Sequence, residues 1–357
     1  NISYIEDNNP VIELENCHNG RIINYIKLEF KNMYSVRVFE EGKALNKIFE
    51  EKSILIAIPD HFGLPQRFKE NLEFLGFKVF VLQNTNKISI PLKDKIIHGF
   101  RKIFFKDKTY KPSIKNKISE QGLFEQLSEI KKVDYAFFIR PDLFSFKIVE
   151  KVKQISNKIV AYQWDGLDRY PLAKKYIGLF DDFYVFDKND LKINRRLKHT
   201  TNFYFDDIVS EKEINPKSVF FVGTYIKNRV PLLEEIIKIL ETNGLAPDIF
   251  LVSNKKSTHH KFRIISEGFS FKESILRIQN SEFLLDLYNP IHNGLSFRTF
   301  ESVGYEKKLI TNNLLVKEYD FYNPNNIFVI ENNNFDGFSD FVKTPYQRLD
   351  IKIKEKY

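Results

Sequence analysis

The chain has 357 residues, enough for two ordinary α/β domains, and 43% hydrophobic residues are enough to build two cores. The single cysteine, Cys17, excludes an internal disulfide and a cysteine-ligated zinc site, no apolar run reaches the length of a membrane span, and the polar start NISYIEDNNP is no signal peptide. A net charge of +8 is compatible with nucleic acid, anionic lipid or a phosphorylated substrate as a partner. We expect a cytoplasmic protein in a reducing compartment.

Residues 1–50 form an N-terminal appendage without a recognisable motif. The stretch 4–16 favours two short strands around an Asn-Asn-Pro turn, and 38–51 favours a helix. This appendage either packs on the first domain or ends a domain that lies further upstream.

Residues 51–210 are predicted to form a parallel α/β domain. The continuous apolar run SILIAIP, which starts at Ser53, is typical of a strand buried on both faces. A helix follows, with apolar residues on one face from Leu64 to Leu75, and Gly76 marks its end before a second strand over 77–82. This βαβ unit is extended by strands at 135–139, 159–162 and 182–186 and by a helix at 146–155.

Residues 211–345 begin in the same way, and 346–357 are left as a C-terminal tail. A buried strand over 218–223 leads into a helix with Pro231 in its first turn and Gly244 at its end. Further elements are expected as strands at 249–252 and 283–288 and a helix at 271–279. The fold class is therefore α/β, with two Rossmann-like doubly wound parallel sheets that face each other across a cleft.

The stretch HNGLSFRTFESVGYEKKLITNN, residues 292–313, predicts a loop, a helix over 295–305 and a strand over 308–311. A glycine turn that opens directly into a helix leaves backbone N–H groups free at the positive end of the helix dipole. Such a turn binds anions. The candidate anion-binding residues of the turn are Asn293, Gly294, Leu295 and Ser296.

Two charged residues follow on this helix. Arg298 and Glu301 are three residues apart, so their side chains can share one side and face a ligand at the turn. A guanidinium suits a diphosphate, and a carboxylate suits a pair of ribose hydroxyls. The alternative is a surface amphipathic helix that carries an unrelated Arg and Glu.

At these residues the chain resembles the GT-B glycosyltransferases of bacterial capsule and lipopolysaccharide synthesis. In that family a segment of the form G-(L/I)-(S/P)-x-R-x-(F/Y)-E, followed by a K-L-(I/L)-T-x-N strand, holds a nucleotide diphosphate-sugar donor. Gly294, Arg298, Phe300, Glu301 and the strand that runs to Asn313 match it. The resemblance implies that the second domain binds the donor and that the first domain handles the acceptor.

The loop GTYIKNR follows the first strand of the second domain. The resemblance places Gly223 close to the donor phosphates, with Lys227 or Arg229 as a countercharge, as in the family's F-x-G-x(4–5)-R segment. The alternative is an ordinary glycine turn between a strand and a helix.

The segment YQWDGLDRYP, residues 162–171, carries the chain's one tryptophan and two carboxylates directly after a predicted strand. It resembles the Tyr-x-Trp-Asp segment of the same transferases. Asp165 is the first candidate for the base that deprotonates an acceptor hydroxyl, and Asp168 is the second. The alternative is that Asp165 caps the turn while Trp164 belongs to the core.

Residues 93–117 form a basic block with interleaved apolar side chains: nine Lys or Arg stand against two acids. A helix of this kind can lie on an anionic bilayer, which would suit a lipid-linked acceptor and a location on the inner face of the cell membrane. The alternative is a solvated basic loop.

No metal is expected as a cofactor. His259 and His260 are adjacent with no acid at ligand spacing, and no Asp-x-Asp motif occurs, which argues against the other large glycosyltransferase fold. No Gly-x-Ser-x-Gly turn supports a nucleophilic serine either.

Together these observations predict a metal-independent glycosyltransferase that moves a sugar from a nucleotide diphosphate-sugar, the co-substrate, to a glycan or glycolipid acceptor. No nucleic-acid partner is expected. Two other readings stay open: a sugar-nucleotide epimerase, since such epimerases share the fold, and a non-catalytic basic protein that binds membranes or nucleic acid.

Overall fold

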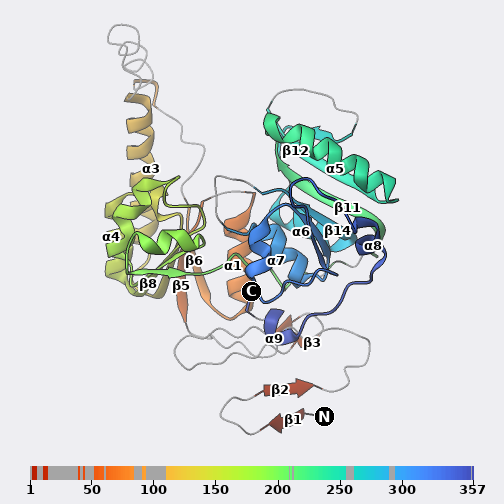
Figure 1. Cartoon of the computed structure of the whole chain (residues 1–357). Helices are drawn as coiled ribbons and strands as arrows, with labels where there is room; N and C mark the ends of the chain where they lie inside the picture. Colours follow the sequence, from red (N-terminus) through yellow and green to blue (C-terminus); the bar gives the residue numbers. More distant parts are fainter. Residues whose placement is uncertain are drawn as a thin grey trace.

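The computed structural model describes two α/β domains and a few short strands near the N-terminus (Figure 1). The described residues are 2–5, 11–14, 39–40, 43–44, 52–59, 62–83, 91–93, 110–208, 210, 213–254, 261–288, 294–354 and 356–357.

The N-terminal appendage contains two small antiparallel pairs. Strands β1 (Ile2–Ile5) and β2 (Val11–Leu14) pair as the sequence predicts. The helix predicted over 38–51 is wrong for the residues described there, because β3 (Phe39–Glu40) pairs with β4 (Lys43–Ala44). Gly42 lies between these strands in the sequence, and glycine weakens a helix at such a position.

The first domain is built on a six-stranded parallel sheet in the order β10-β9-β8-β7-β5-β6. The strand order reverses between β5 and β7, so the carboxyl ends of these strands open a crevice. The strands are β5 (Ser53–Ala57), β6 (Lys78–Leu82), β7 (Val133–Ile139), β8 (Ser156–Gln163), β9 (Asp182–Val185) and β10 (Leu197–His199).

Helices cover both faces of this sheet. On one face α3 (Tyr110–Ser128) and α4 (Phe146–Ile155) pack with the 3-10 segments η1 (Pro141–Leu143) and η2 (Pro171–Leu179). On the other face lies α1 (Leu64–Phe74), which ends before Gly76 with a φ of 97°, as predicted. A third 3-10 segment, η3 (Lys188–Lys192), follows β9.

The second domain has its own six-stranded parallel sheet in the order β13-β12-β11-β14-β15-β16. Its order reverses between β11 and β14, which places the second crevice at the carboxyl ends of these two strands. The strands are β11 (Asn215–Thr224), β12 (Ala246–Val252), β13 (Arg263–Ile265), β14 (Ser281–Asp286), β15 (Lys308–Thr311) and β16 (Ile327–Val329).

The second sheet is also covered on both faces. Helices α5 (Val230–Thr242) and α8 (Phe338–Lys343) pack on one face, and α6 (Phe271–Asn280) and α7 (Phe297–Gly304) pack on the other. Short segments complete the domain: η4 (Lys227–Arg229), η5 (Leu314–Glu318) and α9 (Ile351–Lys354). Both sheets are thus doubly wound, as the sequence predicts.

The two domains contact each other through α1 and α6, which lie next to one another (Figure 1). The Phe271 N–H donates to the Phe62 carbonyl at 2.8 Å. Around this bond the rings of both domains meet mostly edge to face, at centroid distances from 5.3 to 6.3 Å. This aromatic seam consists of Phe68, Trp164, Phe203, Phe205, Phe271 and Phe297.

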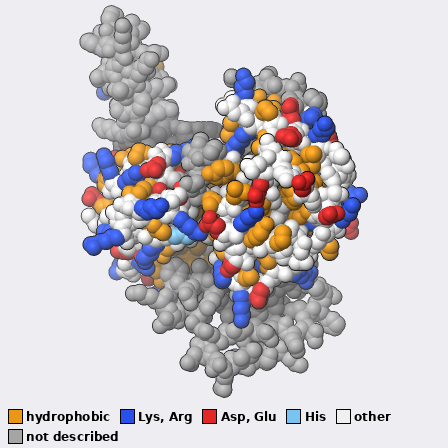
Figure 2. All heavy atoms as spheres, in the orientation of Figure 1, with side chains coloured by type: hydrophobic (Ala, Val, Ile, Leu, Met, Phe, Trp, Pro, Cys, Tyr) orange, Lys and Arg blue, Asp and Glu red, His pale blue; other side chains and the backbone are white. Residues whose placement is uncertain are grey.

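Charge is spread over the visible surface rather than gathered in one area: Figure 2 shows basic side chains on both lobes with acidic ones between them. The predicted basic block falls mostly outside the described residues, which take in Lys93 and, from Tyr110 on, the first turns of α3. Its membrane role therefore stays a prediction. Within the described parts, no helix is both long and apolar enough to cross a bilayer.

Candidate functional site

A cavity of about 230 Å³ lies where the two domains meet. The start of α7 and the carboxyl ends of β14 and β15 form one side of it, and residues that follow β8, β9 and β10 form the other. The strand order predicts the crevice of the second sheet at the ends of β11 and β14, and the cavity shares the end of β14 with it but extends towards β15. Its lining consists of Trp164, Phe186, Asn202, Asp286, Leu287, Tyr288, Gly294, Leu295, Ser296, Phe297 and Asn313.

Gly294 can have no side chain in this arrangement. A Cβ atom added there would lie 2.1 Å from the ring of Phe186, which belongs to the first domain. The Gly294 carbonyl accepts a hydrogen bond from Asn313 Nδ2 at 3.1 Å. Gly294, Leu295 and Ser296 line the cavity, their anion-binding role stays a prediction, and Asn293 lies outside the described residues.

Arg298 and Glu301 share one side of α7, as predicted, but they face each other and do not line the cavity at the turn. Arg298 Nη1 lies 3.5 Å from Glu301 Oε2, and Glu301 is only 4% exposed. Burial raises the pKa of Glu301; the charge of Arg298 opposes this shift, and the nearby carboxylate of Asp286 adds to it. Neither residue is among those that line the cavity, so contact between Glu301 and a ribose stays a prediction.

Asp286, at the end of β14, is a functional candidate that the sequence reasoning missed. It lines the cavity, and burial raises its pKa, while the hydroxyls of Ser296 and Thr299 and the charges of Arg298 and Arg229 oppose that rise. The signal was present, because Asp286 follows the apolar run FLL at the carboxyl end of a buried strand. The same position, an aspartate at the carboxyl end of a predicted strand, made Asp165 a candidate.

Three buried polar atoms at the start of α7 make no hydrogen bond of normal geometry to a described residue: Ser296 Oγ and Thr299 Oγ1, whose hydroxyls act on the Asp286 carboxylate, and Arg298 Nη1, which lies 3.5 Å from Glu301 Oε2. Ser296 is the N-cap residue of α7, yet its hydroxyl makes no capping bond. A buried donor or acceptor without a partner costs roughly 1–3 kcal/mol, so such groups need an explanation. A polar ligand in the adjacent cavity would supply hydrogen bonds of normal geometry.

The two basic residues of the predicted loop after β11 lie in different places, one near the cavity and one on the surface. Arg229 reaches towards the cavity, since its Nη2 donates to the Tyr288 carbonyl at 3.0 Å; burial lowers the pKa of Arg229, and Asp286 opposes that shift. Lys227 is exposed on η4. At Gly223 an added Cβ would lie 2.9 Å from the ring of Phe221, so this glycine allows the strand end to pack closely.

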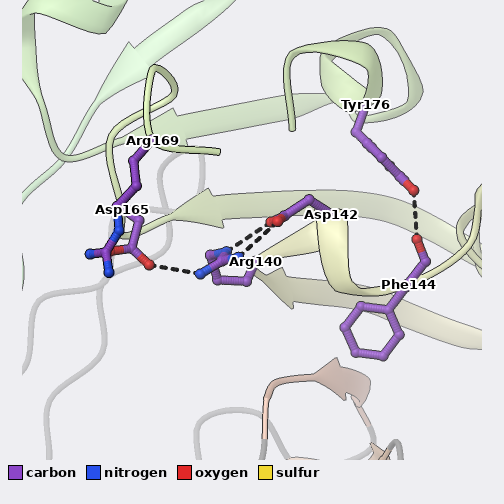
Figure 3. A network of polar contacts seen from close by, with 6 residues as sticks. All are labelled: Arg140, Asp142, Phe144, Asp165, Arg169 and Tyr176. Carbon is purple, nitrogen blue, oxygen red and sulfur yellow. Dashed lines mark hydrogen bonds and ion pairs between the residues drawn. The ribbon is translucent and has the colours of Figure 1, made fainter. Parts of the chain in front are cut away.

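Asp165 belongs to a network at the carboxyl edge of the first sheet (Figure 3). Its Oδ2 accepts from Nη1 of Arg140 at 2.8 Å, and its Oδ1 lies 3.4 Å from Nη1 of Arg169. The Arg140 guanidinium also donates two 2.8 Å hydrogen bonds to Asp142 and stacks on the Tyr170 ring at 3.5 Å. The structure thus places Asp165 beside Trp164 but engages it with two arginines, and its role as a base stays a prediction.

Arg140 is the second residue that the sequence reasoning missed. Its backbone is left-handed, with a φ of 57°, an uncommon conformation for a residue with a side chain. Burial acts to lower the pKa of Arg140, but Asp142 and Asp165 more than offset this and hold it above its ordinary value. Its position after the buried strand FFI, just before Pro141, is the sequence signal.

Asp168 does not join this network. Its side chain is 90% exposed and pairs with Lys174 at 2.9 Å. Below the same loop Asp190 is buried and accepts from the Leu167 N–H at 3.0 Å. Burial raises the pKa of Asp190 to about 6.

Metal ligation finds no support in the part of the chain that the structure describes, where no group of three or more His, Cys, Asp or Glu side chains could hold an ion. His259 and His260 lie outside that part.

Comparisons with known proteins bear on the fold. No protein-family model matches the chain, and no curated protein matches it in sequence. Among solved structures, an alpha-glucosyltransferase in complex with UDP-glucose and DNA containing an abasic site is similar, with a TM-score of 0.50, 12% identity and coverage of 82% of this chain and 89% of the other.

Two further structures are similar to an equal or lower degree. The alpha-glucosyltransferase with UDP and a 13-mer DNA has a TM-score of 0.50 at 11% identity, over 82% of this chain and 89% of that one. The UDP-GlcNAc 2-epimerase from Methanocaldococcus jannaschii has a TM-score of 0.46 at 12% identity, over 85% and 98%. With its two parallel six-stranded sheets flanked by helices, the chain has the GT-B fold.

Proposed function

We propose that the protein is a glycosyltransferase that uses a nucleotide diphosphate-sugar donor. The observation that carries this proposal is the interdomain cavity of a GT-B fold at the start of α7, beside which buried polar atoms of Ser296, Arg298 and Thr299 make no hydrogen bond of normal geometry to a described residue. The backbone N–H groups and the guanidinium there suit a diphosphate. Glucosyltransferases of similar fold are in complex with UDP-glucose or UDP, so a uridine nucleotide is the first to test.

In the proposed reaction an acceptor hydroxyl oxygen attacks the anomeric carbon of the donor sugar. The bond from that carbon to the phosphate oxygen breaks, and the nucleoside diphosphate leaves. Asp165 is the proposed acceptor of the hydroxyl proton, held in place by Arg140 and Arg169. Arg298, Arg229 and the N–H groups at the start of α7 stabilise the charge of the departing diphosphate.

The finer assignment is to bacterial surface polysaccharide synthesis, with a glycan or glycolipid acceptor and no metal requirement. It is supported by the resemblance of residues 292–313 and 162–171 to the capsule and lipopolysaccharide transferases. Cytoplasmic location, with attachment to the inner face of the membrane, belongs to the same proposal.

The test is to incubate the full chain with UDP-, ADP-, GDP- and CDP-sugars and to follow release of the nucleoside diphosphate. Each reaction is run with a soluble glycan, a lipid-linked saccharide, a DNA duplex or no acceptor. Turnover with either saccharide, undiminished in EDTA, is the expected result. Inversion at a sugar carbon without release would identify an epimerase, glycosylated DNA would overturn the expected acceptor, and loss of activity in EDTA would overturn metal independence.

A matched pair of variants localises the site. Arg298→Leu should weaken UDP binding about 10-fold or more, because a charge-assisted hydrogen bond contributes roughly 1.5–3 kcal/mol. Arg277→Leu is the control, since Arg277 pairs with Glu273 and stacks on Phe269 and belongs to α6, no residue of which lines the cavity, whereas α7 lines it at its first residue. Equal effects of the two changes would argue against the site.

A further inference from the structure

Two asparagine side chains hold neighbouring carbonyls at the start of α7. Asn313 Nδ2 donates to the Gly294 carbonyl at 3.1 Å, and Asn202 Nδ2 donates to the Leu295 carbonyl at 2.9 Å. Asn202 Oδ1 in turn accepts from the hydroxyl of Tyr162, at the end of β8 in the first domain, at 2.7 Å. We propose that Tyr162 and Asn202 are positioning residues for a phosphate site at the start of α7, so that the first domain completes the donor site of the second.

The chain of hydrogen bonds has one consistent direction. The Leu295 carbonyl can only accept, so Asn202 must present its NH₂ group there and its oxygen to Tyr162. Tyr162 must then donate. It is buried, and burial raises its pKa, so the phenol keeps the proton that this bond requires.

Fixing these carbonyls also fixes two N–H groups. In a trans peptide the C=O and the N–H point in opposite directions. The N–H of Leu295 shares a peptide plane with the Gly294 carbonyl, and the N–H of Ser296 shares one with the Leu295 carbonyl. Neither N–H donates to a described residue. Both are directed away from the two amides, at the positive end of α7, where no described residue accepts from them.

A second observation marks the same place as a ligand site. The cavity between the domains is lined by Gly294, Leu295 and Ser296 and, from the first domain, by Asn202. Phe186 of the first domain packs against Gly294. The direction of these two N–H groups therefore depends on the position of the first domain. This dependence goes beyond the proposed function, on which it rests.

The experiment measures the phosphate contribution to binding, as the ratio of the dissociation constants of uridine and UDP, by ligand-observed NMR on the full chain. Asn202→Ala should reduce this ratio about 10-fold and Tyr162→Phe about 3-fold, the range expected for losing one neutral hydrogen bond or its support. Uridine affinity itself should stay unchanged. If another nucleotide of the panel binds best, its nucleoside and diphosphate replace uridine and UDP.

Asn326→Ala is the matched control. Asn326 is as deeply buried, and its amide bonds the backbone of Gln347 at 2.7 and 2.8 Å within the second domain. It should lower the melting temperature and leave the ratio unchanged. A wild-type ratio in both Asn202→Ala and Tyr162→Phe overturns the positioning role alone, whereas a wild-type protein that binds no nucleotide overturns the proposed function as well.

Discussion

The buried arginines at the carboxyl edges of the two sheets differ in how completely they are hydrogen-bonded. At the first sheet, Arg140 donates from Nε, Nη1 and Nη2, and Asp142 and Asp165 receive all three bonds (Figure 3). At the second, Arg298 and Glu301 are held 3.5 Å apart, and Nη1 of Arg298 lacks a hydrogen bond among the described residues. We call the first the finished edge, because its charged groups are all paired and support the loop that carries Trp164. We call the second the unfinished edge, because a ligand could supply the hydrogen bond that is missing there.

The largest expected effect tests the finished edge. Arg140→Leu should lower the free energy of unfolding by about 3–5 kcal/mol, because it leaves the carboxylates of Asp142 and Asp165 without their buried partner. Denaturant unfolding followed by circular dichroism measures this. Arg169→Leu, at the exposed end of the network, is the control and should change stability by less than about 1 kcal/mol. Similar losses in both variants would contradict the comparison.

The next prediction tests the unfinished edge. Glu301→Ala should weaken nucleotide binding by roughly 2–4 kcal/mol if its carboxylate accepts from ribose hydroxyls, since two bonds to a charged group are lost. Calorimetric titration with UDP measures the change, and a thermal melt reports the cost of leaving Arg298 unpaired. Unchanged affinity in a folded Glu301→Ala protein would remove Glu301 from the donor site and leave it as a buried ion-pair partner.

Asp165 tests whether the finished edge also takes part in chemistry. Asp165→Asn keeps the size of the side chain but cannot take a proton, so turnover should fall about 100-fold while UDP affinity stays the same. Steady-state rates and a UDP titration on the same preparation separate the two effects. Normal turnover would make Asp165 purely a partner of Arg140, and the exposed Asp168 would become the next candidate.

The smallest expected effect concerns pH. The pKa of Asp190 is raised from 3.8 to about 6, by burial first and then by the charges of Asp187 and Asp168, against the Leu167 N–H and Lys174. The folded protein therefore binds more protons than the unfolded chain between these values, and stability falls as pH rises from about 4 to 6.

Asp190→Asn should remove that fall, because an amide can still accept from the Leu167 N–H. At pH 7 the variant should be more stable than the wild type by about 1–2 kcal/mol, and at pH 4 the two should be equal. Melting temperatures across this pH range provide the measurement. A variant that is less stable at pH 7 would show that the carboxylate is needed in its charged form.

Several elements of the fold were predictable because local pattern specifies them, although the 19-residue helix α3 (Tyr110–Ser128) was not predicted. The helix predicted over 146–155 is α4, and the strand predicted over 308–311 is β15. The edge strands β10, β13 and β16 were not predicted, since each has only three residues and pairs on one side. So short a run carries no periodic signal, and the sheet itself decides its conformation.

The candidate site was predictable only in part. Gly294, Leu295 and Ser296 were found because a glycine turn before a helix has a local physical meaning. Asn202 could not be found in this way, because its role arises from contacts 40 and 93 residues away along the chain. Asp286 had a local signal, because it ends a buried strand, but this signal alone was weak since Asp286 belongs to no motif.

Trp164 has a practical consequence for all these measurements. It is the chain's one tryptophan, it lines the cavity, and its ring meets Phe297 of α7 edge to face at 6.3 Å. An indole is an amphipathic ring whose emission responds to the polarity around it. Intrinsic fluorescence should therefore report ligand entry and any change in the separation of the domains, and stopped-flow mixing with nucleotides could time both events in the unlabelled protein.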